Sequence, residues 1–415
     1  MTISLPSFQV RDRDAYVRLT AVLVLMFMAT GASAPLLSVY VASLGADTGQ
    51  IGLVFATFQG ATLVSQYAWG RQSDRLGRRK PLLLFGTAGM AVSFAAMAAV
   101  PWYGFLFVIR ILEGLAMAAY QSGSLAMVGD LLEHEQDRGR LMGTYRMFGS
   151  LAFSVAALFG GWLADSVGLR AAVLLSALCF GAAFLLVLRV REHAAAQTAA
   201  IPPAANTAAS GGAVAAPRQP STPLLPPWAL WPFLTITVAW FLGMGSVVTL
   251  WPVYMNGVGY AQTAISGLWA LAALGEVPCL YLAGIMADRW GRKWVLIGGV
   301  VGMACVYIAY TLSTTFAWIV AVQLVRSLAY SCFETPSLTY TTELGLRERR
   351  GRLAGLFYTA NGTGGIAGSA LGGALAQGYG LILTFRIAAG IVFAAALAAA
   401  ITMPRRRGPA HDTAP

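Results

Sequence analysis

Charged residues are scarce in this chain. Only 11% of its 415 residues are charged, whereas 57% are hydrophobic, and the mean hydropathy is +0.66. A soluble domain carries roughly 25% charged residues, so this deficit excludes an ordinary soluble enzyme and indicates a polytopic membrane protein. The net charge of +11 would suggest nucleic acid binding in a soluble chain. Here the Arg and Lys residues lie in short loops between apolar runs, so we interpret them as topology signals and expect no nucleic acid partner.

Residues suited to metal, disulfide or catalytic chemistry are equally few. The three histidines fall in polar segments, and the four cysteines lie in apolar runs without forming a CxxC pair. This pattern predicts packing cysteines and no metal site. No G-x-x-x-x-G-K-[ST] loop is present, so the chain hydrolyses no nucleotide itself, and no Ser–His–Asp set can be argued. We therefore expect neither an enzyme nor a cofactor.

Apolar runs long enough to cross a bilayer occur twelve times, in two sets of six. The first run follows a charged N-terminus and is too long for a cleaved signal, so we expect it to be retained. The sequence predicts an all-α membrane protein with twelve transmembrane helices in two pseudo-symmetric six-helix bundles. The runs are 16–43, 50–70, 81–100, 102–132, 139–165 and 168–190, then 229–256, 261–286, 294–312, 315–343, 351–377 and 380–403.

The two sets are separated by a segment rich in Ala, Pro, Ser and Gly at 191–228, which we predict to be a flexible cytoplasmic linker. The predicted domains are therefore an N-terminal bundle at 1–190 and a C-terminal bundle with a short tail at 229–415. Basic residues gather in the loops on one side of the predicted spans. The positive-inside rule places both termini in the cytoplasm, with the protein multi-pass in the plasma (inner) membrane.

A charged loop occurs twice in the chain. Gly70-Arg-Gln-Ser-Asp74-Arg75-Leu-Gly77-Arg78-Arg79-Lys80 returns as Gly284-Ile-Met-Ala-Asp288-Arg289-Trp-Gly291-Arg292-Lys293, close to half a chain length later. Other landmarks repeat in the same order and at nearly the same separation, including Arg110 and Arg326. This repetition indicates two homologous halves. Because each half has six helices, the halves are not inverted relative to each other, and an axis along the membrane normal relates them.

These loops, in a twelve-span setting, resemble those of the major facilitator superfamily, and Arg110-Ile-Leu-Glu-Gly114 is similar to its fourth-helix arginine motif. The resemblance implies that each loop acid contacts the N-terminus of a helix in the opposite half, forming a conformational latch. The alternative is that the basic clusters only fix topology. A glycine-proline motif found in many drug–proton antiporters of the family is incomplete here, because Gly149 to Gly161 contains no proline. The latch candidates are Gly70, Asp74, Arg75, Gly77, Arg78, Gly284, Asp288, Arg289, Gly291 and Arg292.

Five ionisable residues lie inside apolar runs, where an unpaired charge costs about 2.5–3.5 kcal/mol on insertion scales. We expect them to face a central water-filled cavity or one another, and the family resemblance implies a role in proton coupling for Arg110. The alternative is that they form structural ion pairs. Gly275 and Pro278 predict an interrupted helix around Glu276, which would expose backbone to a cavity. The five are Arg110, Glu113, Glu276, Arg326 and Glu334.

Aromatic and polar residues inside the spans are candidates for lining a substrate cavity. The alternative for the Trp and Tyr residues is an aromatic belt at the membrane interface. The candidates are Tyr40, Gln59, Tyr120, Gln121, Trp240, Trp251, Tyr254, Tyr330, Tyr358 and Asn361.

Together these features predict a monomeric secondary transporter that binds a small-molecule substrate and works by alternating access in the lipid bilayer. We expect proton-coupled export of a small amphipathic solute or drug. Three alternatives stay open: a proton symporter taking up a sugar or small organic anion, a lipid flippase, and a non-transporting sensor with the same fold.

Overall fold

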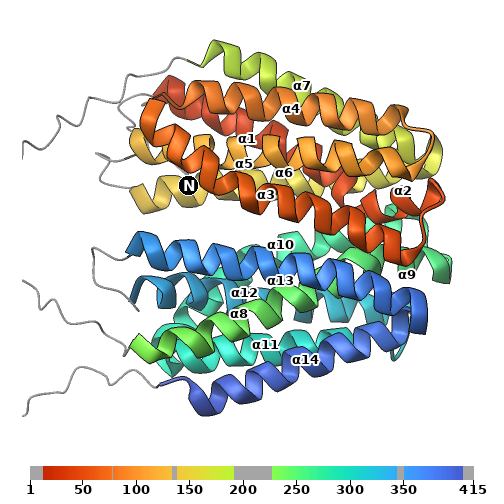
Figure 1. Cartoon of the computed structure of the whole chain (residues 1–415), viewed down its shortest axis with the longest axis vertical. Helices are drawn as coiled ribbons and strands as arrows, with labels where there is room; N and C mark the ends of the chain where they lie inside the picture. The colour runs from red at the N-terminus through yellow and green to blue at the C-terminus, as the bar shows by residue number, and fades with distance from the viewer. Residues whose placement is uncertain (1–12, 77, 133–137, 191–226, 344–349, 405–415) are drawn as a thin grey trace, which may run out of the picture.

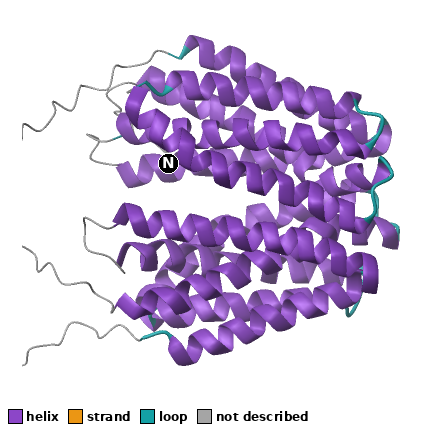
Figure 2. Ribbon diagram, viewed as in Figure 1, coloured by secondary structure: helices purple, strands orange, loops and turns teal. Residues whose placement is uncertain are grey.

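The computed structural model describes residues 13–76, 78–132, 138–190, 227–343 and 350–404, and this part of the chain is helical throughout, with short connections (Figures 1 and 2). The first half contains α1 (Arg13–Ser33), η1 (Ala34–Leu36), α2 (Leu37–Ser43), α3 (Thr48–Leu76), α4 (Lys80–Ala99), η2 (Tyr103–Phe105), α5 (Leu106–Leu131), α6 (Arg138–Ser166) and α7 (Leu169–Arg189). The second half contains η3 (Pro227–Ala229), α8 (Leu230–Gly243), η4 (Met244–Val248), α9 (Thr249–Val258), α10 (Gln262–Trp290), α11 (Arg292–Ala309), α12 (Phe316–Glu343), α13 (Arg350–Tyr379) and α14 (Leu381–Thr402).

Twelve spans arise from these elements, because α1, η1 and α2 form one continuous span and α8, η4 and α9 form another. The prediction of twelve helices in two bundles is confirmed. Among the described residues, ten spans are long and apolar enough to cross a membrane by composition alone. The other two, α3 and α13, are richer in Gly, Gln, Ser and Thr, and they pack against each other across the two halves. The predicted linker at 191–228 lies almost wholly outside the described residues.

The predicted helix interruption around Glu276 is wrong. Helix α10 runs unbroken from Gln262 to Trp290 with Pro278 inside it. The irregular turns occur instead in the first and seventh spans, as the 3-10 turn that contains Pro35 and the π-helical turn Met244–Val248. A proline removes one backbone donor but leaves the remaining helical hydrogen bonds available, so neighbouring turns can preserve the helix.

The repeat seen in the sequence is also present in three dimensions. The Lys80 ammonium group donates to the carbonyl of Leu188 at 2.9 Å, and the Lys293 ammonium group donates to the carbonyl of Ala400 at 2.7 Å. Each lysine thus lies at the start of one helix and caps the C-terminal end of another, where free carbonyls and the helix dipole favour a cation. Each lysine is the last residue of the charged loop of its own half, so the two contacts are equivalent under the repeat.

The two halves meet at the end of the molecule that is remote from the charged loops, which we call the closed end; the opposite end is the loop end. In the described part of the chain, hydrogen bonds between the halves involve residues from 47–59, 154–165, 262–270 and 369–377. Glycines allow the close approach, because a side chain at Gly52 would collide with the backbone of Ser369 and Gly373. The ribbons diverge towards the loop end (Figure 1).

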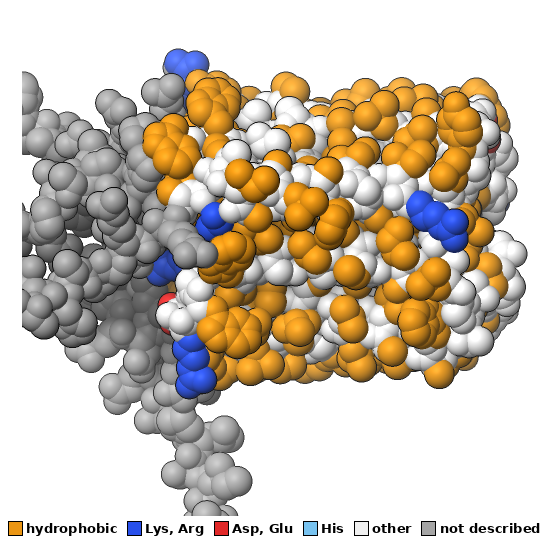
Figure 3. Space-filling view, turned by 90° about the horizontal axis from the view of Figure 1, so that it is seen from below, with side chains coloured by type: hydrophobic (Ala, Val, Ile, Leu, Met, Phe, Trp, Pro, Cys, Tyr) orange, Lys and Arg blue, Asp and Glu red, His pale blue; other side chains and the backbone are white. Residues whose placement is uncertain are grey.

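Hydrophobic side chains are spread over the whole face shown in Figure 3, and most of its Lys and Arg side chains lie at one end. This distribution suits helices that stand in a bilayer with their basic loops in water.

Candidate functional site

One buried arginine in each half lies against an aromatic ring from the neighbouring helix. In the first half, the Arg110 guanidinium carbon lies 4.8 Å from the ring centroid of Phe55 and 4.5 Å from that of Phe58, both on α3. In the second half, the Arg326 guanidinium carbon lies 5.1 Å from the ring centroid of Trp269 on α10. Trp269 has the same place in the second half as Phe55 has in the first, so the two cation–π contacts are equivalent under the repeat.

The acid that pairs with each arginine differs between the halves. Glu113 lies on the same helix as Arg110, and its Oε2 atom is 2.7 Å from the Arg110 Nη1 atom. Their side chains are only 3% and 5% exposed, so this pair is sealed inside the first bundle. A sealed ion pair of this kind is costly to break, since removal of one partner leaves an uncompensated charge.

The Arg326 partner comes from another helix. The Oε1 atom of Glu276 on α10 is 4.0 Å from the Nη1 atom of Arg326 on α12, and the Glu276 side chain is 24% exposed. The pair is therefore longer and more accessible than its counterpart in the first half. An accessible carboxyl group with a loosely held cation can exchange a proton without leaving a sealed, unpaired charge.

A second acid and a second cation extend this group. Glu334 on α12 interacts electrostatically with Glu276 and with Arg146 of α6, which belongs to the first half. Tyr330 interacts with all four charged side chains. We call Arg146, Glu276, Arg326 and Glu334 the charged cluster. It contains three of the five predicted ionisable residues, while Arg110 and Glu113 pair separately.

Arg146 was missed by the sequence reasoning. It lies about two turns, or roughly 12 Å, after the first residue of α6, and its side chain is exposed. It lies inside the predicted run 139–165, close to the basic start of that run, and was not singled out. The available signal was a charge placed well inside a long helix.

Four of the aromatic cavity candidates are buried, each inside the bundle to which it belongs. The Tyr40 hydroxyl donates to the Met97 carbonyl at 2.7 Å, and the ring of Trp240 stacks on Phe333 with centroids 4.1 Å apart. Tyr120 and Trp251 are likewise buried, at 6% and 2% exposure. These side chains support the walls of their own halves in this conformation.

The remaining candidates lie in more open positions or between the halves. Gln59 donates to the Ser369 hydroxyl at 2.7 Å across the two halves, and Gln121 accepts from Gln66 at 3.0 Å. Tyr358 is 48% exposed. Asn361, Tyr254 and Tyr330 are half-buried, with the Tyr254 ring edge-on to Phe385.

The latch candidates of the charged loops are described only in part. Gly77 lies outside the described residues, and the side chains of Asp74 and Arg75 are also outside the description. Asp288 and Arg289 are exposed at the end of α10, and Gly291 has a φ of +87° where the chain turns into α11. The other candidates are Gly70 and Arg292, which are half-buried, Arg78, which is exposed, and Gly284, which is half-buried inside α10.

At the closed end, an acid contacts a helix N-terminus in the opposite half. The Asp165 carboxylate on α6 accepts from the backbone N–H groups of Gln262 and Thr263, each at 2.8 Å, and from the Thr263 hydroxyl at 2.6 Å. These groups form the start of α10, where free N–H groups and the helix dipole favour an anion. At the related contact, Gln377 of α13 donates to Asp47, next to α3, at 3.1 Å.

Comparisons with known proteins agree with this architecture. The family model described as Major Facilitator Superfamily matches residues 19–281 and 268–415. The chain is 27% identical over 346 residues to a maltose permease of Geobacillus stearothermophilus, covering 82% of each protein. It is 27% identical to a putative sugar efflux transporter of Deinococcus radiodurans, covering 91% of this chain and 95% of that one. A crystal structure of nucleoside transporter NupG superposes with a TM-score of 0.77 at 16% identity, covering 93% of this chain and 98% of that chain.

Proposed function

The chain belongs to the major facilitator superfamily of transporters, and from that premise we propose that it exports a small amphipathic solute in exchange for protons. The two halves would rock about their shared interface, exposing a central site to each side of the membrane in turn. The transporter is a monomer of the plasma (inner) membrane, with both termini and the loop end in the cytoplasm.

The observation that carries the proton-coupling proposal is the asymmetry between the two arginine sites. The Arg110–Glu113 pair is short and sealed, whereas the Arg326–Glu276 pair is 4.0 Å long and Glu276 is 24% exposed. Glu276 can therefore meet a proton from water, and Glu334 places a second carboxyl group close enough to interact with it. Protonation would release Arg326 from Glu276, which links the charge of the site to its geometry.

The proposed orientation rests on the basic residues. The described part of the loop end carries nine cations and two acids, Asp14 and Asp288; the cations are Arg18, Arg71, Arg78, Arg79, Lys80, Arg189, Arg289, Arg292 and Lys293. At the closed end, Asp47 and Asp165 accompany Arg170 and Arg386. The positive-inside rule then assigns the loop end to the cytoplasm, and the structure to the inward-facing state of the cycle.

Direction and substrate are proposed from the relatives and the composition of the spans. The relative named as a putative sugar efflux transporter spans nearly the whole chain, which supports export. The maltose permease favours the second candidate function, which is proton-driven uptake of a sugar. The aromatic candidates that are not buried in the walls, Tyr254, Tyr330 and Tyr358, suit an amphipathic solute, because a tyrosine offers both an apolar ring face and a polar hydroxyl group.

Flux measurements in proteoliposomes test this proposal. Purified protein would be screened for thermal stabilisation by sugars, organic acids and cationic dyes, because a bound ligand raises apparent stability. Proteoliposomes are then loaded with the stabilising compound, and a proton gradient is imposed across their membrane. Movement of the compound against the direction of proton flow supports export by antiport. Accumulation in the same direction as the protons would replace export by symport, and flux that ignores the gradient would contradict proton coupling altogether.

A further inference from the structure

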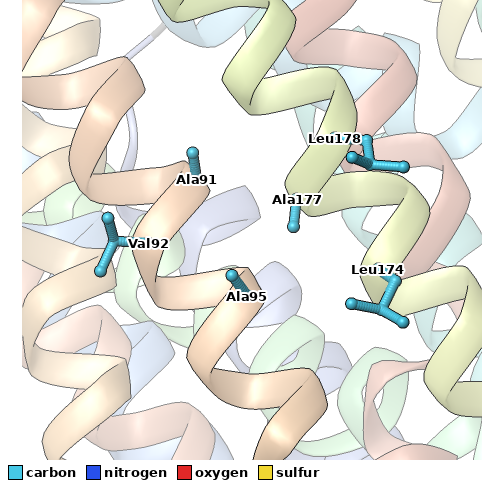
Figure 4. A pocket seen from close by; sticks show the side chains of 6 residues that line it. All are labelled: Ala91, Val92, Ala95, Leu174, Ala177 and Leu178. Carbon is cyan, nitrogen blue, oxygen red and sulfur yellow. The ribbon is translucent and has the colours of Figure 1, made fainter.

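An apolar groove opens on the outer surface of the first half between α4 and α7. Its volume is about 440 Å³, and it is lined by Ala91, Val92, Ala95, Leu174, Ala177 and Leu178 (Figure 4). The alanines leave the space between the two helices unfilled, while Val92 and Leu178 at its edges are 64% and 72% exposed. Both helices are membrane spans, so the medium that meets this groove is hydrocarbon and not water.

The position of the groove along the membrane normal fits the length of a lipid in one leaflet. Ala91 lies about three turns after Lys80 at the start of α4, and Leu178 lies about three turns before Arg189 at the end of α7. Each separation corresponds to roughly 16 Å of helix. Ala95 and Leu174 lie one turn further from Lys80 and Arg189, at roughly 22 Å, so the groove spans about 16–22 Å from the loop end. With its headgroups a bilayer is about 40–45 Å thick, so half of it is about 20–22 Å. The groove therefore lies at the level that the end of an acyl chain reaches when its phosphate is at the loop end.

The loop end of the same two helices is positively charged. The Lys80 ammonium group lies 2.9 Å from the Leu188 carbonyl, next to Arg189, whose side chain is exposed. The Arg18 guanidinium group donates to the Arg189 carbonyl at 2.5 Å and pairs with Asp14 at 2.7 Å. Three cations and one anion thus meet at the end of α7. Such a net positive group at the membrane surface attracts an anionic headgroup.

The equivalent face of the second half differs at the level of the groove. Under the repeat, Ala95 corresponds to Ile308 on α11, and Leu174 corresponds to Arg386 on α14. Arg386 donates to the Thr311 hydroxyl at 3.2 Å, which places a charge where the first half has an apolar wall. The groove is therefore a property of this sequence in the first half and not of the fold.

We propose that the α4/α7 groove is a binding site for an anionic phospholipid. One acyl chain fills the space between Ala91, Ala95 and Ala177, and the phosphate lies against Arg189 and Lys80. The apolar groove provides contact along the chain, and the cations select the headgroup. This assignment concerns the lipid-facing surface and does not depend on the transported substrate.

Photo-crosslinking tests the proposal directly. The protein is reconstituted in phosphatidylcholine vesicles that contain a small fraction of phosphatidylglycerol with a diazirine near the end of one acyl chain. Labelled peptides are then identified by mass spectrometry. We expect the label around Ala91–Ala95 and Leu174–Leu178 to exceed several-fold the label on the equivalent faces of α11 and α14. Unlabelled long-chain phosphatidylglycerol should compete, and a short-chain form with the same headgroup should compete poorly.

Two variants separate the chain from the headgroup. Ala95→Leu fills the groove and should remove most of the label, whereas Val108→Leu, on an exposed position of α5, should not. Arg189→Gln should lower labelling by the phosphatidylglycerol probe but not by a matching phosphatidylcholine probe. Even labelling of both halves, or labelling that Ala95→Leu leaves intact, would overturn the site. Equal wild-type labelling by the two probes would overturn the anionic headgroup. Competition on the wild-type protein decides the matter even if a variant does not fold.

Discussion

Removing the Asp165 carboxylate should loosen the closed end. In the structure, this group accepts two backbone hydrogen bonds and one hydroxyl hydrogen bond from the first two residues of α10, which belongs to the opposite half. An Asp165→Ala substitution deletes both acceptor oxygens, and with them all three hydrogen bonds, without touching the glycine contacts nearby. The first N–H groups of α10 then turn to water or remain unsatisfied. The conformation in which the two halves are in contact at the closed end therefore loses stability relative to the conformation in which they separate there.

The size of the effect follows from the position of the carboxylate. Loss of an acidic group at a helix N-terminus costs about 0.5–2 kcal/mol, with values near 1 typical. Asp165 is largely exposed, so solvent screening keeps its contribution near the middle of this range. A change of about 1 kcal/mol shifts a two-state equilibrium roughly fivefold. We therefore expect the ratio of molecules whose halves have separated at the closed end to molecules whose halves remain in contact there to rise by about this factor.

Distances between spin labels on the two halves measure this population. Suitable positions are Ala99 and Leu312, which are exposed at the closed end of the first and second halves. Each is replaced by cysteine in a protein whose four native cysteines have been substituted. The matched control is Ser166→Ala, because the Ser166 hydroxyl donates only within its own helix, to the Trp162 and Leu163 carbonyls.

A longer-distance component should grow in Asp165→Ala and stay unchanged in Ser166→Ala. Added salt should reduce the difference between wild type and Asp165→Ala, since it screens the charge of an exposed carboxylate. Identical distance distributions in the two variants would refute the reasoning. They would show that the glycine packing holds the closed end without this contact.

Three further substitutions probe the two arginine sites and the second cross-half contact. Glu113→Gln leaves the buried Arg110 without a charged partner and should destabilise the protein by about 3–5 kcal/mol, measured as a lower thermal unfolding temperature. The protein that remains folded should still couple transport to protons. Lost coupling at unchanged stability would assign the coupling role to the first half. Arg326→Lys keeps the charge but removes the planar contact with Trp269, which is worth about 0.5–2 kcal/mol. The initial rate of substrate flux should therefore fall between about twofold and thirtyfold. An initial rate equal to that of the wild type would contradict this. Gln377→Ala removes a single hydrogen bond to Asp47 and should change the spin-label distances less than Asp165→Ala does. An equal or larger change would contradict the view that Asp165 stabilises the closed end more than Gln377.

The helical architecture could be read from the sequence because its signals are local. Apolar runs and flanking basic loops located the twelve spans, and the duplicated charged loop indicated the two halves. The irregular helix turns could not be placed in this way. Pro278 suggested a break in α10 but lies inside a continuous helix, while the π-helical turn occurs at Met244–Val248, which carries no proline. The packing of neighbouring helices decides whether a proline interrupts a span.

The charged cluster was only partly predictable for a different reason. A charge inside an apolar run is visible in the sequence, which singled out Glu276, Arg326 and Glu334. Which charges meet depends on helix rotation and on the contact between halves. The i,i+3 spacing of Arg110 and Glu113 placed them on one helix face and allowed an ion pair, but no sequence pattern indicated that this pair would be sealed. Nor did any pattern indicate that Arg146 of the first half would interact with Glu334 of the second.

The account depends most on Glu276 as the group that carries the coupling proton. Glu276→Gln fixes this side chain in a neutral form of nearly the same shape. In proteoliposomes, the variant should exchange labelled for unlabelled substrate at close to the wild-type rate, yet fail to move substrate against its gradient when a proton gradient is imposed. Full proton-driven accumulation by Glu276→Gln would contradict the central claim.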